Sequence, residues 1–491
     1  MLRVLKPGVL LLVVAMVTGG CFAGAAAGGD TGGRLRVVLP VPPAKALSPW
    51  GDDALLLTRL GIAEPLVELD SAGVPAAGLA ESWTRTGDTS WRFRLRAGVK
   101  FHNGAALTAP DAANALTKAT TASPLPRALK GVGLTASAEG ERDLVITTAK
   151  ADPVLPQRLS SPNLVILAPS AYQPDRVDPA GTATGPFVLK SLVGKDTATL
   201  DAFAGYWAGA PRSPGVDVRF VPDATARAGA LRAGEADIVQ SLPVAASVDP
   251  KQLLEVPLPR TVFLHLNAAG GPFADAGLRA AVRAAVDPAA LARGVYEGQA
   301  EAARGIYGPA SPWAPTQREF APVPVPSVPN GQKIVLATHS DRAELPEVAS
   351  VVAEALRAKG FVVEQVVREY SLLEPDLLAG KFDAVISSRS YLLDTGDPFA
   401  FLSTDLTCKG GYNLSRLCDP AIDTTVAASG VLGEPKAREA AALKVEAEVL
   451  ATGALIPLVH ERAHLGVASG VEDVAADSFE RHLVTKGTHR S

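Results

Sequence analysis

Hydrophobic and polar positions follow a strand-like pattern in the first half of the chain. Three apolar residues alternate with arginines over 91–95, which predicts a strand with one buried face. Residues 187–192 and 197–203 predict two more strands, and Gly194 between them predicts a hairpin. Short apolar runs predict further buried strands, at 35–39, 216–220 and 262–266. Long insertions separate these strands.

Helix-start signals are clearest at Thr108. Thr108 suits the N-cap, Pro110 suits the first turn, and an apolar run to Leu116 follows. A second helix is predicted at 224–233, where Gly234 would end it. Two further apolar segments predict helices, at 55–62 and 274–285.

The order of elements changes after a segment at 321–331 that carries four prolines and predicts a stiff connecting loop. The elements predicted beyond it are, in order, strand 333–337, helix 346–359, strand 362–367, strand 382–387, helix 434–451 and strand 454–459. Strands that alternate with helices predict a parallel sheet with helices on its faces.

Composition narrows the class of protein. The 491 residues suffice for two or three domains, and 47% of them are apolar, which allows a large core. Only 20% are charged, with a formal net charge of −4. A nucleic-acid-binding protein usually has a basic excess, so we expect no nucleic-acid partner.

Residues 1–21 read as a targeting segment. Two basic residues precede an apolar stretch at 9–17, which is too short to cross a bilayer as a helix. Thr18-Gly19-Gly20-Cys21 then resembles a bacterial lipobox, in which the cysteine is acylated. Thr18 departs from that pattern, which prefers an aliphatic residue, and the alternative is an ordinary secretory signal. We expect an extracytoplasmic protein anchored to the cell membrane through Cys21, with 22–33 as a flexible tether.

Cys408 and Cys418 lie ten residues apart, and export would place them in an oxidising compartment. A disulfide is therefore predicted, worth about 3 kcal/mol for a loop of this size; two free thiols are the alternative. A zinc site is not expected, because no histidine lies within twenty residues of either cysteine. His460 and His464 need not share a face of a strand, so no metal site is predicted there either.

Several separated stretches, in one order, resemble the peptide/nickel class of ABC-importer solute-binding proteins. They are EPLVELD (64–70), GLAESW (78–83), WRFRLRAGVKFHNG (91–104), LTAPD (107–111), GPFVLK (185–190), GYWAGAP (205–211), FVPDATARAGALRAGEADI (220–238), FLHLNAAGGPFADAGLRAAVRAAVDPAAL (263–291) and LIPL (455–458). Any one could be coincidence, but their shared order over nearly the whole chain is not plausibly chance.

The resemblance implies an α/β, two-lobed fold of the periplasmic-binding-protein type that closes on a solute about a hinge. Lobe I would comprise 34–60, 168–259 and 462–491, with an extra subdomain at 61–167, and lobe II would comprise 260–461. The implied partners are the permease subunits of an ABC importer and a small peptide or peptide-like solute, and the protein would be a monomer. The resemblance implies no cofactor.

The segment 387–401 carries the ligand hypothesis. In dipeptide- and oligopeptide-binding relatives the matching strand ends in a tryptophan, and an aspartate three residues later pairs with the peptide's α-amino group. Tyr391 and Asp394 occupy these positions here. A charge-assisted hydrogen bond of this kind is worth about 1.5–3 kcal/mol. The alternatives are that Asp394 only caps its loop, as Asp397 is expected to do, and that Tyr391 belongs to the core.

A peptide carboxylate would need a cation. Arg342 lies near the position where dipeptide-binding relatives carry an arginine, and Arg389 is the alternative. Both arginines also have a structural interpretation. The loop between the cysteines, with Gly411 and Asn413, could border the cleft and provide backbone donors.

Two other classes of function stay open. A secreted hydrolase on the same scaffold would need a nucleophile and base in the cleft, but the chain contains no GxSxG, HExxH or Walker A motif, and we expect no enzyme. A binding module for sensing or envelope interaction would need the same cleft as a transport receptor. A peptide, an opine, a metal chelate and a sugar are all open as the ligand.

Overall fold

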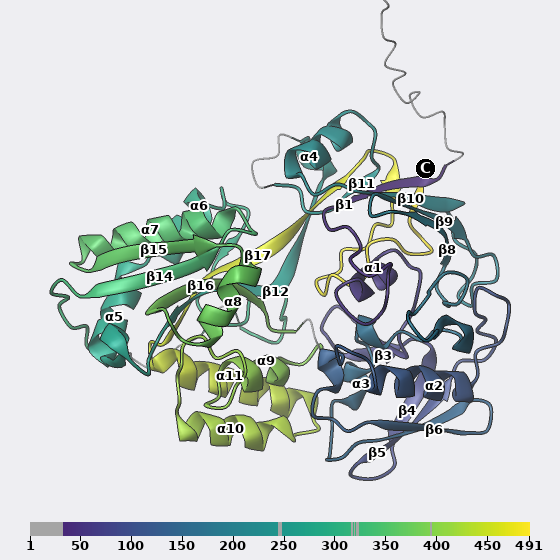
Figure 1. Ribbon diagram of the computed structural model, residues 1–491, viewed down its shortest axis with the longest axis horizontal. Helices are drawn as coiled ribbons and strands as arrows, with labels where there is room; N and C mark the ends of the chain where they lie inside the picture. The colour runs from purple at the N-terminus through teal and green to yellow at the C-terminus, as the bar shows by residue number, and fades with distance from the viewer. Residues whose placement is uncertain (1–32, 244–247, 316–317, 319, 321–323, 393–394) are drawn as a thin grey trace, which may run out of the picture. The chain divides into compact units, whose positions relative to one another are not determined.

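Two long apolar strands, β12 (Leu253–Leu266) and β17 (Leu455–Val467), run through both halves of the molecule (Figure 1). They pair antiparallel with each other, and their register shifts between Pro257 and Thr261. Pro257 and Pro259 provide no backbone N–H, so the ladder is interrupted where the chain passes from one half to the other. The computed structural model describes residues 33–243, 248–315, 318, 320, 324–392 and 395–491.

The main sheet has eleven strands in the order β15-β14-β16-β12-β17-β11-β1-β10-β9-β8, with β13 paired to β17. On one side of the β12–β17 pair lie β1 (Leu35–Leu39), β8 (Phe187–Val193), β9 (Thr197–Ala202), β10 (Gly215–Phe220) and β11 (Ile238–Val239). On the other side lie β13 (Glu301–Ala302), β14 (Lys333–His339), β15 (Val362–Arg368) and β16 (Ala384–Ser390). The hairpin predicted at Gly194 forms between β8 and β9.

The expectation of a parallel sheet is only partly correct. Strand β14 pairs parallel with both β15 and β16, as the strand–helix–strand pattern predicts. Strand β16 then pairs antiparallel with β12, so the sheet as a whole is mixed. The two predicted single-strand segments at 262–266 and 454–459 are also longer than expected, because each strand continues through the crossing between the halves.

The first half contains two large apolar cores, beside a smaller one around Leu231 and Val239. One lies around β1 and β8–β10, and α1 (Ala54–Arg59) and the C-terminal residues Leu483 and Val484 pack into it. The other lies between α2 (Ala109–Thr120) and a four-stranded sheet. That sheet has the order β4 (Ala80–Arg85), β5 (Ser90–Leu95), β7 (Asp143–Thr147) and β6 (Thr135–Glu139). The remaining elements of this half are β2 (Val67–Leu69), β3 (Pro75–Ala77), α3 (Leu155–Arg158) and α4 (Ala224–Arg232), while β18 (Val471–Glu472) and β19 (His489–Arg490) follow β17.

The helix start predicted at Thr108 is confirmed. The backbone N–H of Thr108 donates to the Asp111 carboxylate at 3.0 Å, and its hydroxyl donates to the same oxygen at 2.6 Å. Pro110 lies in the first turn, where its missing N–H breaks no helical hydrogen bond.

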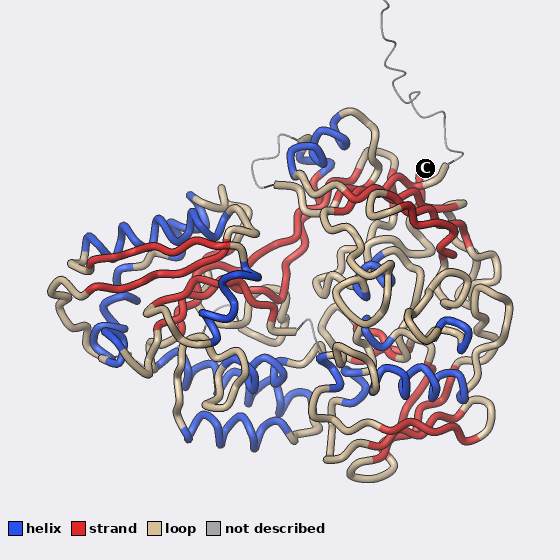
Figure 2. The backbone as a smooth tube through the Cα atoms, in the orientation of Figure 1, coloured by secondary structure: helices blue, strands red, loops and turns tan. Residues whose placement is uncertain are grey.

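Helices cover both faces of β14–β16 in the second half (Figure 2). Helices α5 (Ala276–Ala285), α6 (Pro288–Gly294) and α7 (Glu344–Ala358) share a core with alternate residues of these strands. Helix α8 (Tyr370–Leu378) packs on the other face through Leu373 and Leu377. Helices α9 (Pro398–Asp405), α10 (Pro420–Gly430) and α11 (Pro435–Ala451) form a separate layer with Phe263 and Tyr391. Among the described residues, no helix combines the length and apolar character of a membrane span.

Candidate functional site

Charged residues gather where β12 and β17 pass between the two halves. Arg342, after β14, forms two hydrogen bonds with the Glu461 carboxylate in β17, at 2.6 and 2.9 Å. Ser388 in β16 donates to the same carboxylate at 2.5 Å. The Glu461 side chain is 3% exposed, whereas that of Arg342 is 34% exposed. Arg342 therefore lies between the buried Glu461 carboxylate and the solvent, with part of its own side chain exposed.

The same cluster extends to the C-terminal segment. Arg260 in β12 donates to Glu480 at 3.1 Å, and its Nε lies 3.9 Å from Glu461. Arg59, at the end of α1, places a guanidinium nitrogen 3.7 Å from Glu480. In these contacts three guanidinium groups share two carboxylates, and we call the five residues the junction cluster.

Opposing effects set the charge of the two glutamates. Burial alone would raise the pKa of Glu461, but the charges of Arg342 and Arg260 outweigh it and hold the pKa below its ordinary value. The pKa of Glu480 is lowered in the same way, against burial, by Arg260 and Arg59. Both side chains are therefore ionised at neutral pH.

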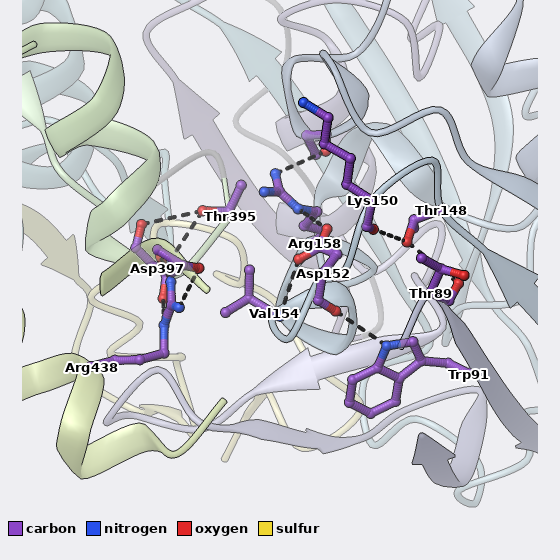
Figure 3. Close-up of polar contacts among 12 residues, drawn as sticks. Thr89, Trp91, Thr148, Lys150, Asp152, Val154, Arg158, Thr395, Asp397 and Arg438 are labelled. Atoms are coloured by element: carbon purple, nitrogen blue, oxygen red, sulfur yellow. Dashed lines mark hydrogen bonds and ion pairs between the residues drawn. The ribbon is translucent and has the colours of Figure 1, made fainter. Parts of the chain in front are cut away.

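A cavity of about 310 Å³ lies between the subdomain that contains α2 and the layer formed by α9–α11. One wall comes from residues 130–132, 150–154 and Arg158, and the other from 395–403 and 426–438. Figure 3 shows the polar contacts of the two walls. We call it the gap cavity, because its walls belong to different apolar cores.

Each carboxylate on these walls has its own guanidinium partner. Asp152 accepts from Arg158 Nε at 2.6 Å and from the Val154 N–H at 3.1 Å (Figure 3). Asp397 accepts from Arg438 at 2.9 and 2.7 Å, and both side chains of that pair are less than a tenth exposed. Asp397 also caps α9 by accepting from the Phe399 N–H, the loop role expected for it.

Arg389, the alternative cation for a ligand carboxylate, is engaged within its own half. Its guanidinium forms hydrogen bonds of 2.7 and 2.9 Å with Asp405 and lies 4.1 Å above the Tyr412 ring. Asp405 is fully buried, so the pair anchors β16 to α9. This geometry favours the structural interpretation of Arg389.

Tyr391 lies in the core, which favours its structural interpretation over contact with the ligand. Its side chain is 1% exposed, and its ring meets Tyr307 edge-on at 5.2 Å. Its hydroxyl accepts a hydrogen bond from the Gly308 N–H at 3.1 Å. Asp394, the proposed partner of a ligand amine, lies outside the described residues, as does Cys21.

The loop between the two cysteines is held by its own side chains. The Cys408 and Cys418 sulfur atoms lie 2.17 Å apart. Asn413 donates to the carbonyls of Thr407 and Leu417, at 3.0 and 2.7 Å, so its amide stabilises the loop. A Cβ atom added at Gly411 would meet no atom within 4 Å, so this residue borders open space.

A second cavity, of about 380 Å³, lies beside Glu64 and is lined also by Glu68, Tyr206, Trp207 and His482. Glu64 accepts hydrogen bonds from the Tyr206 hydroxyl at 2.8 Å and the Trp207 Nε1–H at 3.1 Å. Burial raises the pKa of Glu64 to about 7, because these neutral donors only partly offset it. His482 pairs with Glu68 at 3.0 Å.

The histidines serve structural contacts. His102 Nε2 lies 2.9 Å from the Gly185 carbonyl, and burial lowers its pKa to about 4. His460 Nδ1 lies 2.9 Å from the Thr261 hydroxyl, across the pair of long strands. Within the described part of the chain, no group of three or more metal-binding side chains is found.

Sequence reasoning missed Arg260, Glu461 and Glu480. A signal existed for Glu461, which stands with other polar residues inside the otherwise apolar run LIPLVHERAHLGV. A carboxylate within a buried strand needs a cationic partner, and such a residue marks a candidate site. No comparable signal identified Glu480, which lies in an irregular segment.

Comparison with known proteins gives consistent results. The sequence profile of the bacterial extracellular solute-binding proteins, family 5, matches residues 74–413. A probable di/tripeptide-binding protein of Pseudomonas aeruginosa is 26% identical over 479 residues, covering 85% of this chain and 88% of that protein. The nickel-binding protein NikA of Staphylococcus aureus is 26% identical over 424 residues, covering 82% and 84%. The crystal structure of NikA from Brucella suis in complex with Fe(III)-EDTA superposes with a TM-score of 0.81 at 21% identity, covering 93% of this chain and 100% of that one, which shows a shared two-lobed α/β fold.

Proposed function

Because this chain belongs to the bacterial extracellular solute-binding proteins of family 5, we propose that it captures a short peptide or similar amine-bearing solute and delivers it to the permease of an ABC importer. The names of its relatives, a di/tripeptide-binding and a nickel-binding protein, support this class of cargo.

The gap cavity is the observation that carries the proposal. Its two walls belong to different cores, so a solute bound there touches both. A ligand that contacts both lobes stabilises the closed state over the open one by the contacts that only closure provides. Binding of a solute in this cavity would therefore favour closure of the two lobes.

The interrupted ladder between β12 and β17 supports a hinge. We assign 34–60, 168–259 and 462–491 to lobe I, 61–167 to its extra subdomain and 260–461 to lobe II. The boundary at 259/260 falls within the register shift between Pro257 and Thr261. Few backbone hydrogen bonds need to break there, so the two strands can bend without loss of either core.

The polar groups at the junction fit a ligand that carries a carboxylate. Arg342 is one-third exposed, so it can donate to a ligand while it holds Glu461. We assign the ligand amine to Asp394.

Three further features belong to the proposal. Acylation at Cys21 would anchor the mature protein to the outer face of the cell membrane, with 22–33 as its tether. A bond between Cys408 and Cys418 would fix the loop beside α9. The protein would act as a monomer, because each chain contributes both walls of its own cavity.

The arrangement most like a hydrolase is inaccessible. His265 Nε2 lies 2.9 Å from the Ser387 hydroxyl, but both side chains are buried within the sheet, at 2% and 3% exposure. Burial lowers the pKa of His265 to about 3, and a substrate has no path to the pair. This favours binding over hydrolysis. Uptake of labelled peptide by cells with and without the gene separates transport from sensing.

The test is calorimetry with trialanine and with N-acetyl-trialanine, alongside small-angle scattering. Trialanine should bind and compact the protein, and N-acetylation should weaken binding because it removes the charged amine. Asp394→Asn should weaken trialanine binding by more than about tenfold, which corresponds to one lost charge-assisted contact. Asp175→Asn, an exposed aspartate in lobe I, is the control. Absence of heat and compaction with every peptide would overturn the proposal, and unchanged affinity of Asp394→Asn would remove that residue from it.

A further inference from the structure

The gap cavity has a surplus of positive charge on its subdomain wall. Lys130 and Lys150 line it, and both are exposed. In the part of the chain that the structure describes, no ion pair engages either lysine. Among the described lining residues the carboxylates are Asp152 and Asp397, and each is bound to its own arginine. The lysines are therefore the charges without an opposite partner among the lining residues that the structure describes.

The two lysines are held on one wall by the contacts of Arg158. Its Nε binds Asp152 at 2.6 Å, and its Nη1 donates to the Ala128 carbonyl at 3.3 Å. Arg158 thus ties the segment that carries Lys150 to the segment that carries Lys130. The Thr148 hydroxyl also donates to the Lys150 carbonyl at 2.6 Å, which fixes the backbone at that lysine (Figure 3).

The opposite wall does not repel an anion. The C-terminal carbonyls of a helix carry partial negative charge, and α10 ends at this cavity. Arg438 donates to the carbonyls of Gly430 and Leu432, both at 2.8 Å, so these two carbonyls already have a hydrogen-bond partner. The lining there also includes Val426, Ala427 and Val431, which suit the aliphatic part of a side chain, beside the hydroxyl residues Thr395 and Ser403.

We propose that the gap cavity is a specificity subsite for an acidic side chain of the bound peptide-like solute, held by Lys130 and Lys150. The inference rests on the proposed function, because it assumes a peptide bound between the lobes. Two lysines that line one cavity raise the local concentration of anions and favour ligands with a second carboxylate. The protein would then prefer glutamate- or aspartate-containing peptides over their neutral amides.

The test compares peptides that differ by one charge. Calorimetry measures Ala-Ala-Ala, Ala-Ala-Gln and Ala-Ala-Glu, and also Ala-Glu-Ala, on the full mature chain. We expect one of the glutamate peptides to bind about fivefold to tenfold more tightly than its neutral counterpart at low salt, and this preference to shrink as salt is added. The double variant Lys130→Glu with Lys150→Glu should abolish the preference, so that neither glutamate peptide binds more tightly than its neutral counterpart.

The matched control is the double variant Lys100→Glu with Lys118→Glu. Both of these lysines are exposed on the same subdomain and lie outside the cavity lining, so the net charge changes equally. The control should keep the preference for glutamate. Equal affinities for acidic and neutral peptides, or equal loss in both double variants, would overturn the subsite alone. Failure of every peptide to bind would overturn the proposed function and the subsite together.

Discussion

Two glutamates in this molecule, the partly buried Glu64 and the buried Glu461, have pKa values shifted in opposite directions. Glu64 is bound by Tyr206 and Trp207, whose donors are neutral, and its pKa is raised by burial to about 7. Burial would likewise raise the pKa of Glu461, but two guanidinium groups reverse the direction and lower it. Burial raises the free energy of the ionised carboxylate, and the charge of the neighbouring groups decides whether the carboxylate stays ionised.

The difference suits the places that the two residues occupy. Glu461 lies at the junction of the lobes, where a cluster that is ionised at neutral pH holds Arg342 in position. Glu64 lies inside lobe I and its subdomain, where it can take up a proton near neutral pH. The stability of the region around Glu461 should therefore depend on its arginine partners, and the stability of the region around Glu64 should depend on pH.

The largest expected effect comes from removing the partner of Glu461. Arg342→Met leaves a carboxylate with 3% exposure and only Arg260, 3.9 Å away, to balance it. We expect a loss of about 2–3 kcal/mol in the free energy of unfolding at pH 7, since an unpaired buried charge is far more costly than a broken surface pair. Urea unfolding without peptide measures it.

Lys444→Met is the control for this change. Lys444 forms an exposed pair with Glu448 four residues on in α11, at 3.8 Å. Such a pair contributes at most about 0.5 kcal/mol. If Arg342→Met lowers the free energy of unfolding no more than Lys444→Met does, the buried Glu461 does not need the charge of Arg342. That result would contradict the cause assigned to its lowered pKa.

The second prediction concerns the pH dependence that Glu64 creates. Its folded pKa of about 7 lies above the ordinary 4.5, so the folded state holds the proton more tightly than the unfolded chain. The stabilisation is fully present below about pH 4.5 and is lost as pH rises to 7. After allowance for solvent screening, the loss is about 2 kcal/mol.

Glu64→Gln removes this titration without much change in shape. The difference in unfolding free energy between wild type and Glu64→Gln, followed from pH 4.5 to 8, should therefore shift in favour of the variant as pH rises. Other titrating groups are common to both proteins and cancel. Parallel curves would mean that Glu64 is charged in the folded state, like Glu461. Glu461 itself has the opposite sign: its contribution is present above about pH 4.5 and is lost on acidification through its lowered pKa.

Local sequence signals predicted much of the fold. The cap at Thr108, the hairpin at Gly194 and the β14–α7–β15 unit all depend on contacts between residues close in the chain. The two-lobed fold followed from ordered motifs over the whole chain. The extension of β12 through Pro257 was not predicted, because proline is unfavourable inside a central strand. In the structure, Pro257 lies at the register shift between β12 and β17.

The candidate site was less predictable for a physical reason. Arg342 was singled out, but its partner Glu461 lies 119 residues further along the chain. The sequence placed Arg389 and Tyr391 together at the end of one strand. In the structure, however, Asp405 binds Arg389, and the α9–α11 layer buries Tyr391. The alternation of residues along a strand predicts which side chains share a face. Contacts with residues far away in the sequence determine which of these faces is free to meet a ligand.

The smallest expected effect lies beside Glu64, at the pair formed by Glu68 and His482. Burial lowers the pKa of His482, but the hydrogen bond and charge of Glu68 outweigh it, so the pKa lies above the ordinary 6.5. The stabilisation is therefore present below pH 6.5 and is lost as pH rises through the raised value. Since the His482 side chain is 36% exposed and that of Glu68 is 24% exposed, we expect the pair to contribute less than about 1 kcal/mol.

An NMR titration of the His482 ring measures this pair directly. Glu68→Gln should lower the pKa of His482, because it removes the charge that opposes burial. The same substitution should also lower the pKa of Glu64, since the charge of Glu68 helps to raise it. A matched change at Asp70, exposed on the neighbouring turn, should leave His482 unaltered. If Glu68→Gln leaves both titrations unchanged, the two carboxylates do not interact, and the raised pKa of Glu64 is the work of burial alone.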